Sequence, residues 1–187
     1  ALLIDGARRI GKSYIVEQFA KENYKSYILI DFNKIGDDIK KLFDNYLNDL
    51  DTLFMYLSSF YKVDLHERES LIIFDEVQKF PRAREAIKYL VKDGRYHYIE
   101  TGSLISIKKK SQEIVIPSEE DKRKMFPMDF EEFLWATGDN VTAPFIKDCF
   151  EKRIPMGDKL HRKIMTTFRT YFAIGGMPQV IEAFVQG

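Results

Sequence analysis

The segment that most constrains this chain is residues 6–13, which read Gly-Ala-Arg-Arg-Ile-Gly-Lys-Ser. It fits the phosphate-loop pattern G-x-x-x-x-G-K-S without a mismatch, and it lies between an apolar strand pattern at residues 2–5 and a helical pattern that continues through Ala20. The glycines let such a loop curl so that successive backbone N–H groups point inward, and the positive end of the following helix attracts anions. The segment therefore predicts a strand–loop–helix unit that binds phosphate groups.

The side chains of this loop suggest a nucleoside triphosphate. Lys12 is expected to reach the terminal phosphates, and the Ser13 hydroxyl is expected to bind Mg²⁺. Arg8 and Arg9 either add positive charge near the nucleotide, meet a neighbouring domain or are solvated. The sequence has no guanine-reading Asn/Thr-Lys-x-Asp motif, which favours adenine. We therefore expect ATP and Mg²⁺, bound by the residues of the pattern and the residue after it: Gly6, Ala7, Arg8, Arg9, Ile10, Gly11, Lys12, Ser13 and Tyr14.

A second motif consists of four apolar residues followed by two acids. Residues 71–74 read Leu-Ile-Ile-Phe, which indicates a buried strand, and Asp75 and Glu76 come directly after it. In open α/β sheets, ligands bind at the carboxyl ends of the strands. Asp75 is predicted to hold Mg²⁺ through water, and Glu76 is predicted to polarise the attacking water as a general base. A strand that simply ends in two solvated acids is the alternative, and the phosphate loop upstream favours the functional interpretation.

Another strand pattern, at residues 96–99, leads to two hydroxyl residues. Thr101 or Ser103 is a candidate polar sensor of the γ-phosphate or of the attacking water, and a plain strand-ending turn is the alternative. Residues 27–32 form one more strand pattern, and helical patterns separate the strands. Strands that alternate with helices are typical of a mainly parallel sheet covered on both faces. The sequence thus predicts an α/β fold, the three-layer α/β/α sandwich of the P-loop NTPases.

The alternation of strand and helix patterns stops towards the end of the chain. Residues 108–124 are polar without a clear period and predict a solvated loop. Beyond them only helical patterns occur, beginning at Asp129, which can cap a helix. We therefore predict a P-loop core over residues 1–128 and a helical attachment over residues 129–187. Because neither end carries a finished element, we expect the chain to be the front part of a longer protein.

The amino-acid composition excludes or disfavours several classes of function. Lys plus Arg equals Asp plus Glu, at 29 each, so the net charge gives no support for a general affinity for nucleic acid or anionic membrane. The single cysteine, Cys149, excludes an internal disulfide framework and a thiolate metal cluster, and it is expected at an ordinary half-buried helix position. No apolar run approaches the roughly 20 residues of a membrane span, and no secretory signal is visible. A cytoplasmic protein is expected.

Four segments together resemble a known family. They are GARRIGKS, LIIFDEVQKFPRAREAI, ETGSLISI and FPMDFEEFLW, at residues 6–13, 71–87, 100–107 and 126–135. They resemble the bacterial and archaeal AAA-type ATPases that carry a C-terminal domain of unknown function related to a restriction-endonuclease fold. The first two segments are general to P-loop ATPases, and the last is the most family-specific.

The resemblance covers nearly the whole chain and carries several implications. It implies ATP binding and hydrolysis coupled to an unknown output, and a C-terminal domain of which this chain holds little. It also implies the AAA/RecA-like branch, in which an extra strand lies between the phosphate-loop strand and the acidic strand. The chain departs from many relatives at residues 121–124, where Asp-Lys-Arg-Lys replaces a Gly-Arg pair. An arginine role is therefore not carried over to Arg123.

Three functions are compatible with these motifs. The first is slow Mg-dependent ATP hydrolysis that resets a conformational switch in a larger protein, and Glu76 favours it because a pure binder needs no base. The second is a nucleotide-dependent binding module with negligible turnover. The third is a P-loop phosphotransferase, although no arginine-rich lid is evident. Arg82 and Arg84 are expected on a solvated helix face, so we expect an activating arginine from a homo-oligomer, a partner protein or the missing domain.

Overall fold

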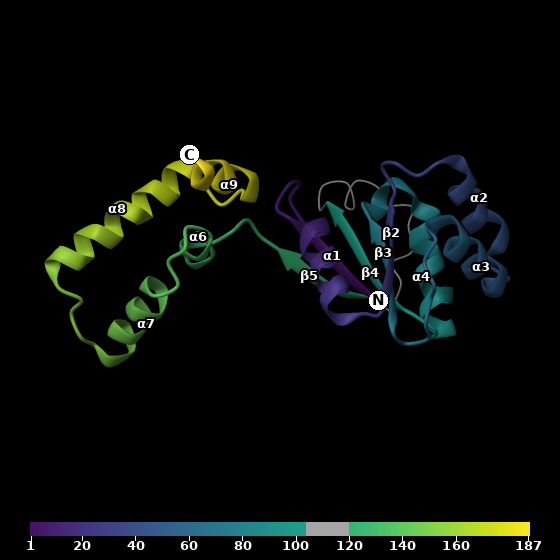
Figure 1. Cartoon of the computed structure of the whole chain (residues 1–187), viewed down its shortest axis with the longest axis horizontal. Helices are drawn as coiled ribbons and strands as arrows, with labels where there is room; N and C mark the ends of the chain where they lie inside the picture. The colour runs from purple at the N-terminus through teal and green to yellow at the C-terminus, as the bar shows by residue number, and fades with distance from the viewer. Residues whose placement is uncertain (104–119) are drawn as a thin grey trace. The chain divides into compact units, whose positions relative to one another are not determined.

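A computed structural model describes residues 1–103 and 120–187, which form two compact units, Ala1–Met125 and Phe126–Gly187 (Figure 1). The first unit contains a sheet with helices on both faces, and the described part of the second consists of helices. No helix in the described ranges is both long and apolar enough to cross a membrane.

The sheet of the first unit is parallel throughout and has the order β2-β3-β4-β1-β5. Strand β4 therefore lies between β1, which leads into the phosphate loop, and β3, which ends in the acidic pair. This is the inserted strand that the AAA/RecA-like branch implies, and the predicted fold class is confirmed. The strands are β1 (Leu2–Gly6), β2 (Ser26–Asp31), β3 (Ser70–Asp75), β4 (His97–Ser103) and β5 (Asp121–Met125).

Strand β5 corrects the sequence prediction, which placed residues 121–124 in a solvated loop. These residues pair with β1 along its whole length, from Leu2 opposite Asp121 to Gly6 opposite Met125. The pattern Asp-Lys-Arg-Lys hid the strand because a sheet edge needs no apolar alternation, and charged side chains there discourage pairing with other chains. Residues 108–119 of the predicted loop lie outside the described residues.

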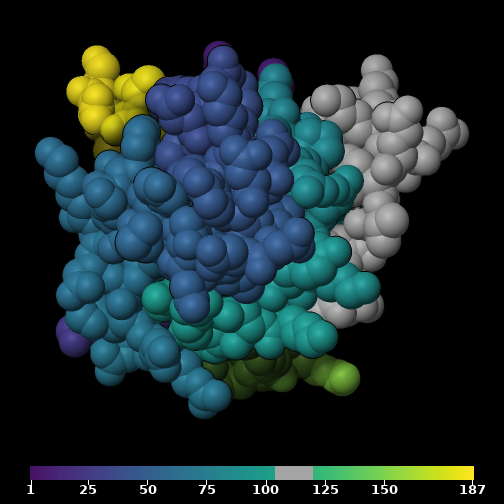
Figure 2. Space-filling model, turned by 90° about the vertical axis from the view of Figure 1, so that its right-hand side faces the viewer, coloured from purple at the N-terminus to yellow at the C-terminus, as the bar shows by residue number. Residues whose placement is uncertain are grey.

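Helices cover the two faces of the sheet unequally. On one face, Val16 and Ala20 of α1 pack against Leu71, Ile73 and Ile99 of the sheet. On the other face, three helices enclose a larger core rich in phenylalanine, and the outer surface of this side faces the viewer in Figure 2. The result is the three-layer sandwich. Its helices are α1 (Lys12–Asn23), α2 (Asp37–Tyr46), α3 (Leu50–Tyr61), the short 3₁₀ helix η1 (Val77–Lys79) and α4 (Pro81–Asp93).

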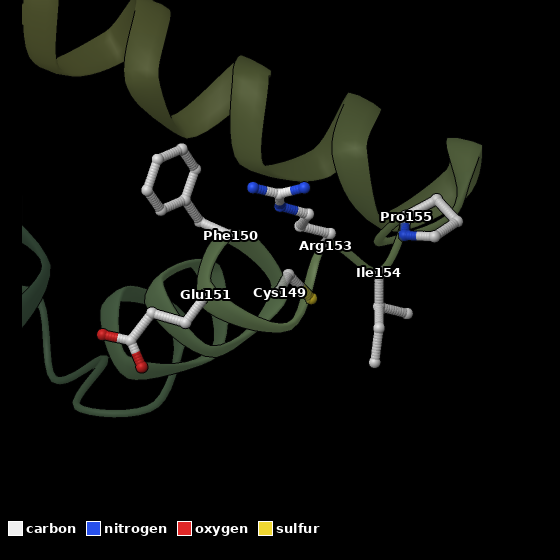
Figure 3. Close-up of a pocket in the computed structure, with 6 residues that line it drawn as sticks. All are labelled: Cys149, Phe150, Glu151, Arg153, Ile154 and Pro155. Carbon is white, nitrogen blue, oxygen red and sulfur yellow. The ribbon is translucent and has the colours of Figure 1, made fainter.

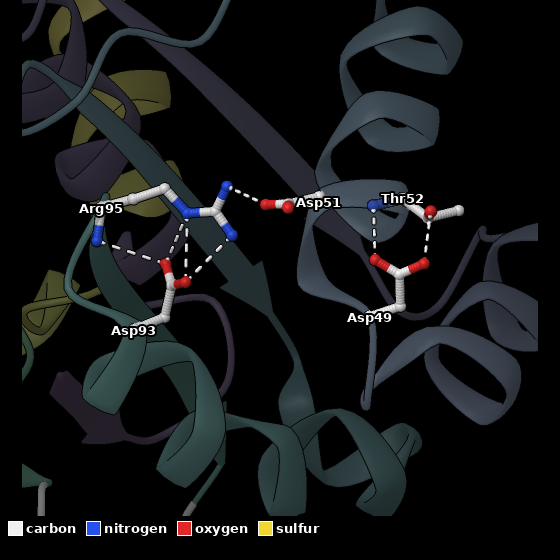
Figure 4. A network of polar contacts seen from close by, with 5 residues as sticks. All are labelled: Asp49, Asp51, Thr52, Asp93 and Arg95. Carbon is white, nitrogen blue, oxygen red and sulfur yellow. Dashed lines mark hydrogen bonds and ion pairs between the residues drawn. The ribbon is translucent and has the colours of Figure 1, made fainter.

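A polar network ties α3 to the connection between α4 and β4 (Figure 4). The Arg95 guanidinium lies 2.6 Å from the Asp51 carboxylate and 2.8 Å from that of Asp93, and it stands 4.8 Å from the centre of the Phe54 ring. Hydrogen bonds from Arg95 lower the pKa of Asp93. Nearby, Asp49 caps the first turn of α3. These contacts hold the outer helical layer to the sheet.

The second unit is built around aromatic contacts. Asp129 and Glu132 form the capping box of its first helix, as the sequence predicts. The Phe133 ring lies 5.5 Å from the ring of Tyr171 and 6.2 Å from that of Phe184, so one aromatic residue joins three helices. The helices are α6 (Phe130–Ala136), α7 (Thr142–Lys152), α8 (Asp158–Ile174) and α9 (Pro178–Gln186).

Candidate functional site

The sheet brings three distant segments to one edge. Strands β1, β4 and β3 are consecutive neighbours and parallel, so their carboxyl ends, at Gly6, Ser103 and Asp75, lie on the same side. This is the edge at which open α/β sheets bind ligands. The phosphate loop, the acidic pair and the two hydroxyl residues therefore belong to one site.

The phosphate loop needs its glycines for space and for backbone conformation. A Cβ at Gly6 would collide with the backbone oxygen of Met125 and would lie 2.6 Å from the side chain of Ile10. Gly11 has a φ of 93° and precedes α1, and Arg9 is also left-handed, with a φ of 63°. No side chain among the described residues caps α1. Its first backbone N–H groups are therefore available to an anion, which fits phosphate.

Lys12 lies inside this loop. Its side chain is 5% exposed, and its Nζ donates hydrogen bonds to the backbone oxygens of Ala7 at 2.6 Å and Gly6 at 3.3 Å. Burial lowers the pKa of Lys12, while the nearby carboxylates of Glu76 and Asp75 act in the opposite direction. The loop thus holds a buried ammonium group, whose charge a bound phosphate group would neutralise.

Asp75 is the centre of a hydroxyl cluster. The Ser13 hydroxyl donates to Asp75 Oδ1 at 2.7 Å, and the buried Thr101 hydroxyl donates to the same oxygen. Thr101 Oγ1 also accepts a hydrogen bond from the backbone N–H of Glu76 at 3.1 Å. Hydroxyl and carboxylate oxygens are the ligands that Mg²⁺ prefers, so Ser13 and Asp75 fit the predicted metal site. Thr101 links the two acids.

Glu76 is held in an uncommon conformation beside this cluster. Its φ is 55°, in the left-handed region that disfavours residues with a Cβ, by about 1–2 kcal/mol. Its carboxylate accepts a hydrogen bond from Nε2 of Gln78, and the same nitrogen lies 3.5 Å from the buried Ser103 hydroxyl. The structure thus brings all four predicted catalytic residues, Lys12, Glu76, Thr101 and Ser103, to one edge of the sheet.

Two residues of this edge escaped the sequence interpretation. Gln78 was missed, although it follows Glu76 by only two positions. Asp5, directly before the phosphate loop, is fully buried and lies 2.9 Å from Nζ of Lys122 on β5. Its partner could not be recognised because β5 itself was not predicted.

The arginines differ in their environments. Arg84, expected on a solvated face, is buried at 2% side-chain exposure and binds both carboxylate oxygens of Glu120, at 3.0 and 3.1 Å. The expectation was wrong because Arg84 lies on the side of α4 that packs against the sheet. Arg82 is half-exposed, and Arg123 lies on the edge strand, paired with Asp121 at 3.2 Å.

The remaining loop side chains face solvent. Ala7, Arg8, Arg9 and Tyr14 are exposed, whereas Ile10 is buried beneath the loop. Arg8 is close enough to Lys12 to lower the pKa of its ammonium group slightly, after burial and the three nearby carboxylates. Arg8 therefore lies within electrostatic reach of an anion at this edge.

The second unit has a hollow of its own at the end of α7 (Figure 3). It has a volume of about 710 Å³, and Cys149 is buried at its wall, as expected for a helix position. The described residues contain no group of three or more histidine, cysteine, aspartate or glutamate side chains that could hold a metal ion. We assign no ligand to this hollow, which is lined by Cys149, Phe150, Glu151, Arg153, Ile154 and Pro155.

Comparisons with known proteins show which family the chain belongs to. A family model described as an AAA domain matches residues 1–134. Among solved structures, that of C. elegans PCH-2 is similar at 15% sequence identity and a TM-score of 0.40, over 73% of this chain. The chain spans 37% of the length of that PCH-2 chain. None of the curated proteins matches. Because the family model covers 134 of the 187 residues, the chain belongs to the AAA domain family.

Proposed function

We propose that the first unit binds Mg-ATP at the carboxyl edge of its sheet and hydrolyses it slowly. The observation that carries this proposal is the convergence of Lys12, Ser13 and the two acids, with the Ser13 hydroxyl 2.7 Å from the Asp75 carboxylate. These groups come from segments more than 60 residues apart, as the separation of 62 between Ser13 and Asp75 shows. A solvated strand end would not gather them.

Each group has a distinct task in this proposal. The loop N–H groups and the Lys12 ammonium bind the phosphates, and Ser13 and Asp75 hold Mg²⁺. The bound ion supplies positive charge against the phosphate oxygens. The Glu76 carboxylate accepts a proton from the attacking water, so that a hydroxide equivalent bonds to the γ-phosphorus while the bond to the β,γ-bridging oxygen breaks. Ser103 and Thr101 fix the acids and the water.

Slow turnover follows from where the arginines lie. Stabilising the charge that develops on the γ-phosphoryl group can raise P-loop hydrolysis by roughly 10³- to 10⁵-fold. Arg84 is paired with Glu120, and Arg123 is paired with Asp121 on the edge strand. Arg8 and Arg9 of the phosphate loop are exposed, and no contact among the described residues fixes either side chain against the γ-phosphate position. We propose a rate below about one turnover per second for this chain, raised by a second subunit, a partner protein or the protein's own C-terminal domain. Such a cycle would act as a conformational switch.

Two variants test the proposal. Lys12→Ala should abolish detectable Mg-ATP binding in calorimetric titration, because it removes the buried charge from the loop. Glu76→Gln should leave Kd near that of the parent and lower the single-turnover rate by roughly 10²-fold or more, the usual effect of a lost general base. Lys92→Ala and Glu22→Gln, at exposed positions, are the matched controls.

The outcomes separate the alternatives. An unchanged Kd for Lys12→Ala would refute the phosphate loop as a binding site. Parent-like hydrolysis by Glu76→Gln would remove Glu76 as the base. Tight binding without any turnover would favour a nucleotide-dependent binding module, and phosphate transfer to added small-molecule acceptors would favour a phosphotransferase.

A further inference from the structure

Gln78 is a buried amide that contacts the proposed base. It lies in η1, directly after Glu76 and Val77, and its side chain is 2% exposed. Its Nε2 donates to Glu76 Oε2 and lies 3.5 Å from Ser103 Oγ. The orientation of the amide follows from chemistry, because an ionised carboxylate only accepts hydrogen bonds and must face the NH₂ group.

The other end of this amide argues against a purely structural role. Gln78 Oε1 is buried and accepts no hydrogen bond from any residue that the structure describes. A buried acceptor without a partner destabilises a fold, whereas an apolar side chain of the same shape would not. Packing alone would therefore favour methionine or leucine here, and the amide needs another explanation. Its nitrogen, which contacts Glu76 and Ser103, supplies one.

The contacts of Glu76 show what this nitrogen achieves. The backbone N–H of Glu76 is tied to Thr101 on β4, and Gln78 connects its carboxylate towards Ser103, two residues further along the same strand. The backbone N–H of Glu76 is thus bonded directly to β4, and its carboxylate is connected to the same strand through Gln78.

We propose that Gln78 is a positioning residue, which fixes the Glu76 carboxylate relative to Ser103 for the hydrolytic step. This inference rests on the proposed function and deepens it by assigning a role to a residue directly after the acidic pair and Val77. Gln78 acts through Glu76, so its loss affects the reaction and not the binding of nucleotide. Misplacing a catalytic group by about 1 Å can lower a rate by roughly 10²-fold.

Gln78→Met tests the proposal because it keeps the length of the side chain and removes the amide. In the full chain, we expect an unchanged Kd for Mg-ATP and a single-turnover rate lower by roughly 10- to 100-fold. The thermal midpoint from circular dichroism should not fall. Gln18→Met on α1 is the control and should leave both quantities unchanged. Gln78→Asn, which keeps an amide but shortens its reach, should lower the rate in the same direction and serves if Gln78→Met does not fold.

A double-mutant comparison separates this inference from the proposed function. If Gln78 acts through Glu76, then adding Gln78→Met to Glu76→Gln should change the remaining rate less than about twofold. An equal further loss in that background, or a parent-like rate for Gln78→Met alone, would overturn the positioning role while Glu76→Gln still reports on the base. Loss of stability and activity in parallel, in both Gln78 variants, would assign the residue to the fold instead.

Discussion

Replacing Glu100 by glutamine should change how the stability of the first unit depends on pH. Glu100 lies in the middle of β4, fully buried, and its carboxylate accepts no hydrogen bond within the described part of the chain. Its pKa is raised from 4.5 to about 8, chiefly by burial. The carboxylate of Glu120 contributes to this rise, and the Arg84 guanidinium opposes it. Glu100 therefore stays protonated in the folded protein near neutral pH.

The size of the expected effect on the free energy of unfolding follows from the difference between the pKa of Glu100 in the folded and in the unfolded chain. Below a pH of about 4.5 both the folded and the unfolded chain carry the proton, so Glu100 has no effect on the pH dependence there. Between that pH and about 8 the folded state keeps a proton that the unfolded state loses, so the free energy of unfolding falls as pH rises. Each pH unit in this interval costs about 1.4 kcal/mol. The whole interval amounts to about 5 kcal/mol, and a change from about pH 6 to about pH 7.5 to about 2 kcal/mol.

Glu100→Gln removes this dependence because an amide does not ionise in this range. Urea unfolding, followed by far-ultraviolet circular dichroism at about pH 6 and about pH 7.5, measures the effect. Tryptophan emission would not serve, since the single tryptophan, Trp135, belongs to the second unit. The variant should gain about 2 kcal/mol on the parent between the two pH values, and the exposed control Glu22→Gln should gain nothing. Parallel pH profiles for parent and variant would refute the reasoning.

Two further substitutions test the packing that supports the site. Gly6→Ala should destabilise the first unit by about 1–3 kcal/mol and weaken Mg-ATP binding in calorimetric titration, because its Cβ would collide with the backbone of Met125. Gly36→Ala, where a Cβ meets no atom within 4 Å, should leave Mg-ATP binding unchanged and destabilise the unit less than Gly6→Ala, since it affects only the N-cap of α2. Equal effects at the two glycines would contradict the steric argument. Arg95→Met should lower the free energy of unfolding by about 1–2 kcal/mol at low salt through loss of the contacts with Asp51 and the Phe54 ring, and less at high salt. A loss that is independent of salt would show that packing of the alkyl chain, and not charge, is responsible.

The parts of the fold that the sequence predicted are those in which chemistry or burial imposes a pattern. The phosphate loop requires small residues, a lysine and a hydroxyl at fixed spacing, and β3 is buried along its whole length, so its central residues 71–74 are apolar. Strand β5 shows neither pattern. It joins the sheet through backbone hydrogen bonds, which leave no signature in residue type, and through the ion pair of Lys122 with Asp5. Its charged side chains therefore looked like a loop.

The buried charges around β4 were unpredictable for a different reason. Arg84 and Glu120 are polar residues separated by 36 positions, and each alone is expected at the surface. Only the folded chain reveals that they pair and that Glu100 is buried near them. The same holds for Gln78, whose partner Ser103 is 25 positions away. Pairwise burial of polar groups is a property of the packing and is not encoded in any local pattern.

The hydrogen bonds of the site imply how ligand binding would reach the acids. Ser13 and Thr101 donate to the same oxygen of Asp75, so a ligand that draws the Ser13 hydroxyl away leaves Thr101 as the donor to that oxygen. Thr101 Oγ1 also accepts the backbone N–H of Glu76, and a shift of this hydroxyl therefore changes the restraint on the proposed base. Asp75 and Thr101 thus connect the phosphate loop to the backbone N–H of Glu76. This connection consists of three hydrogen bonds, which join α1, the end of β3 and β4.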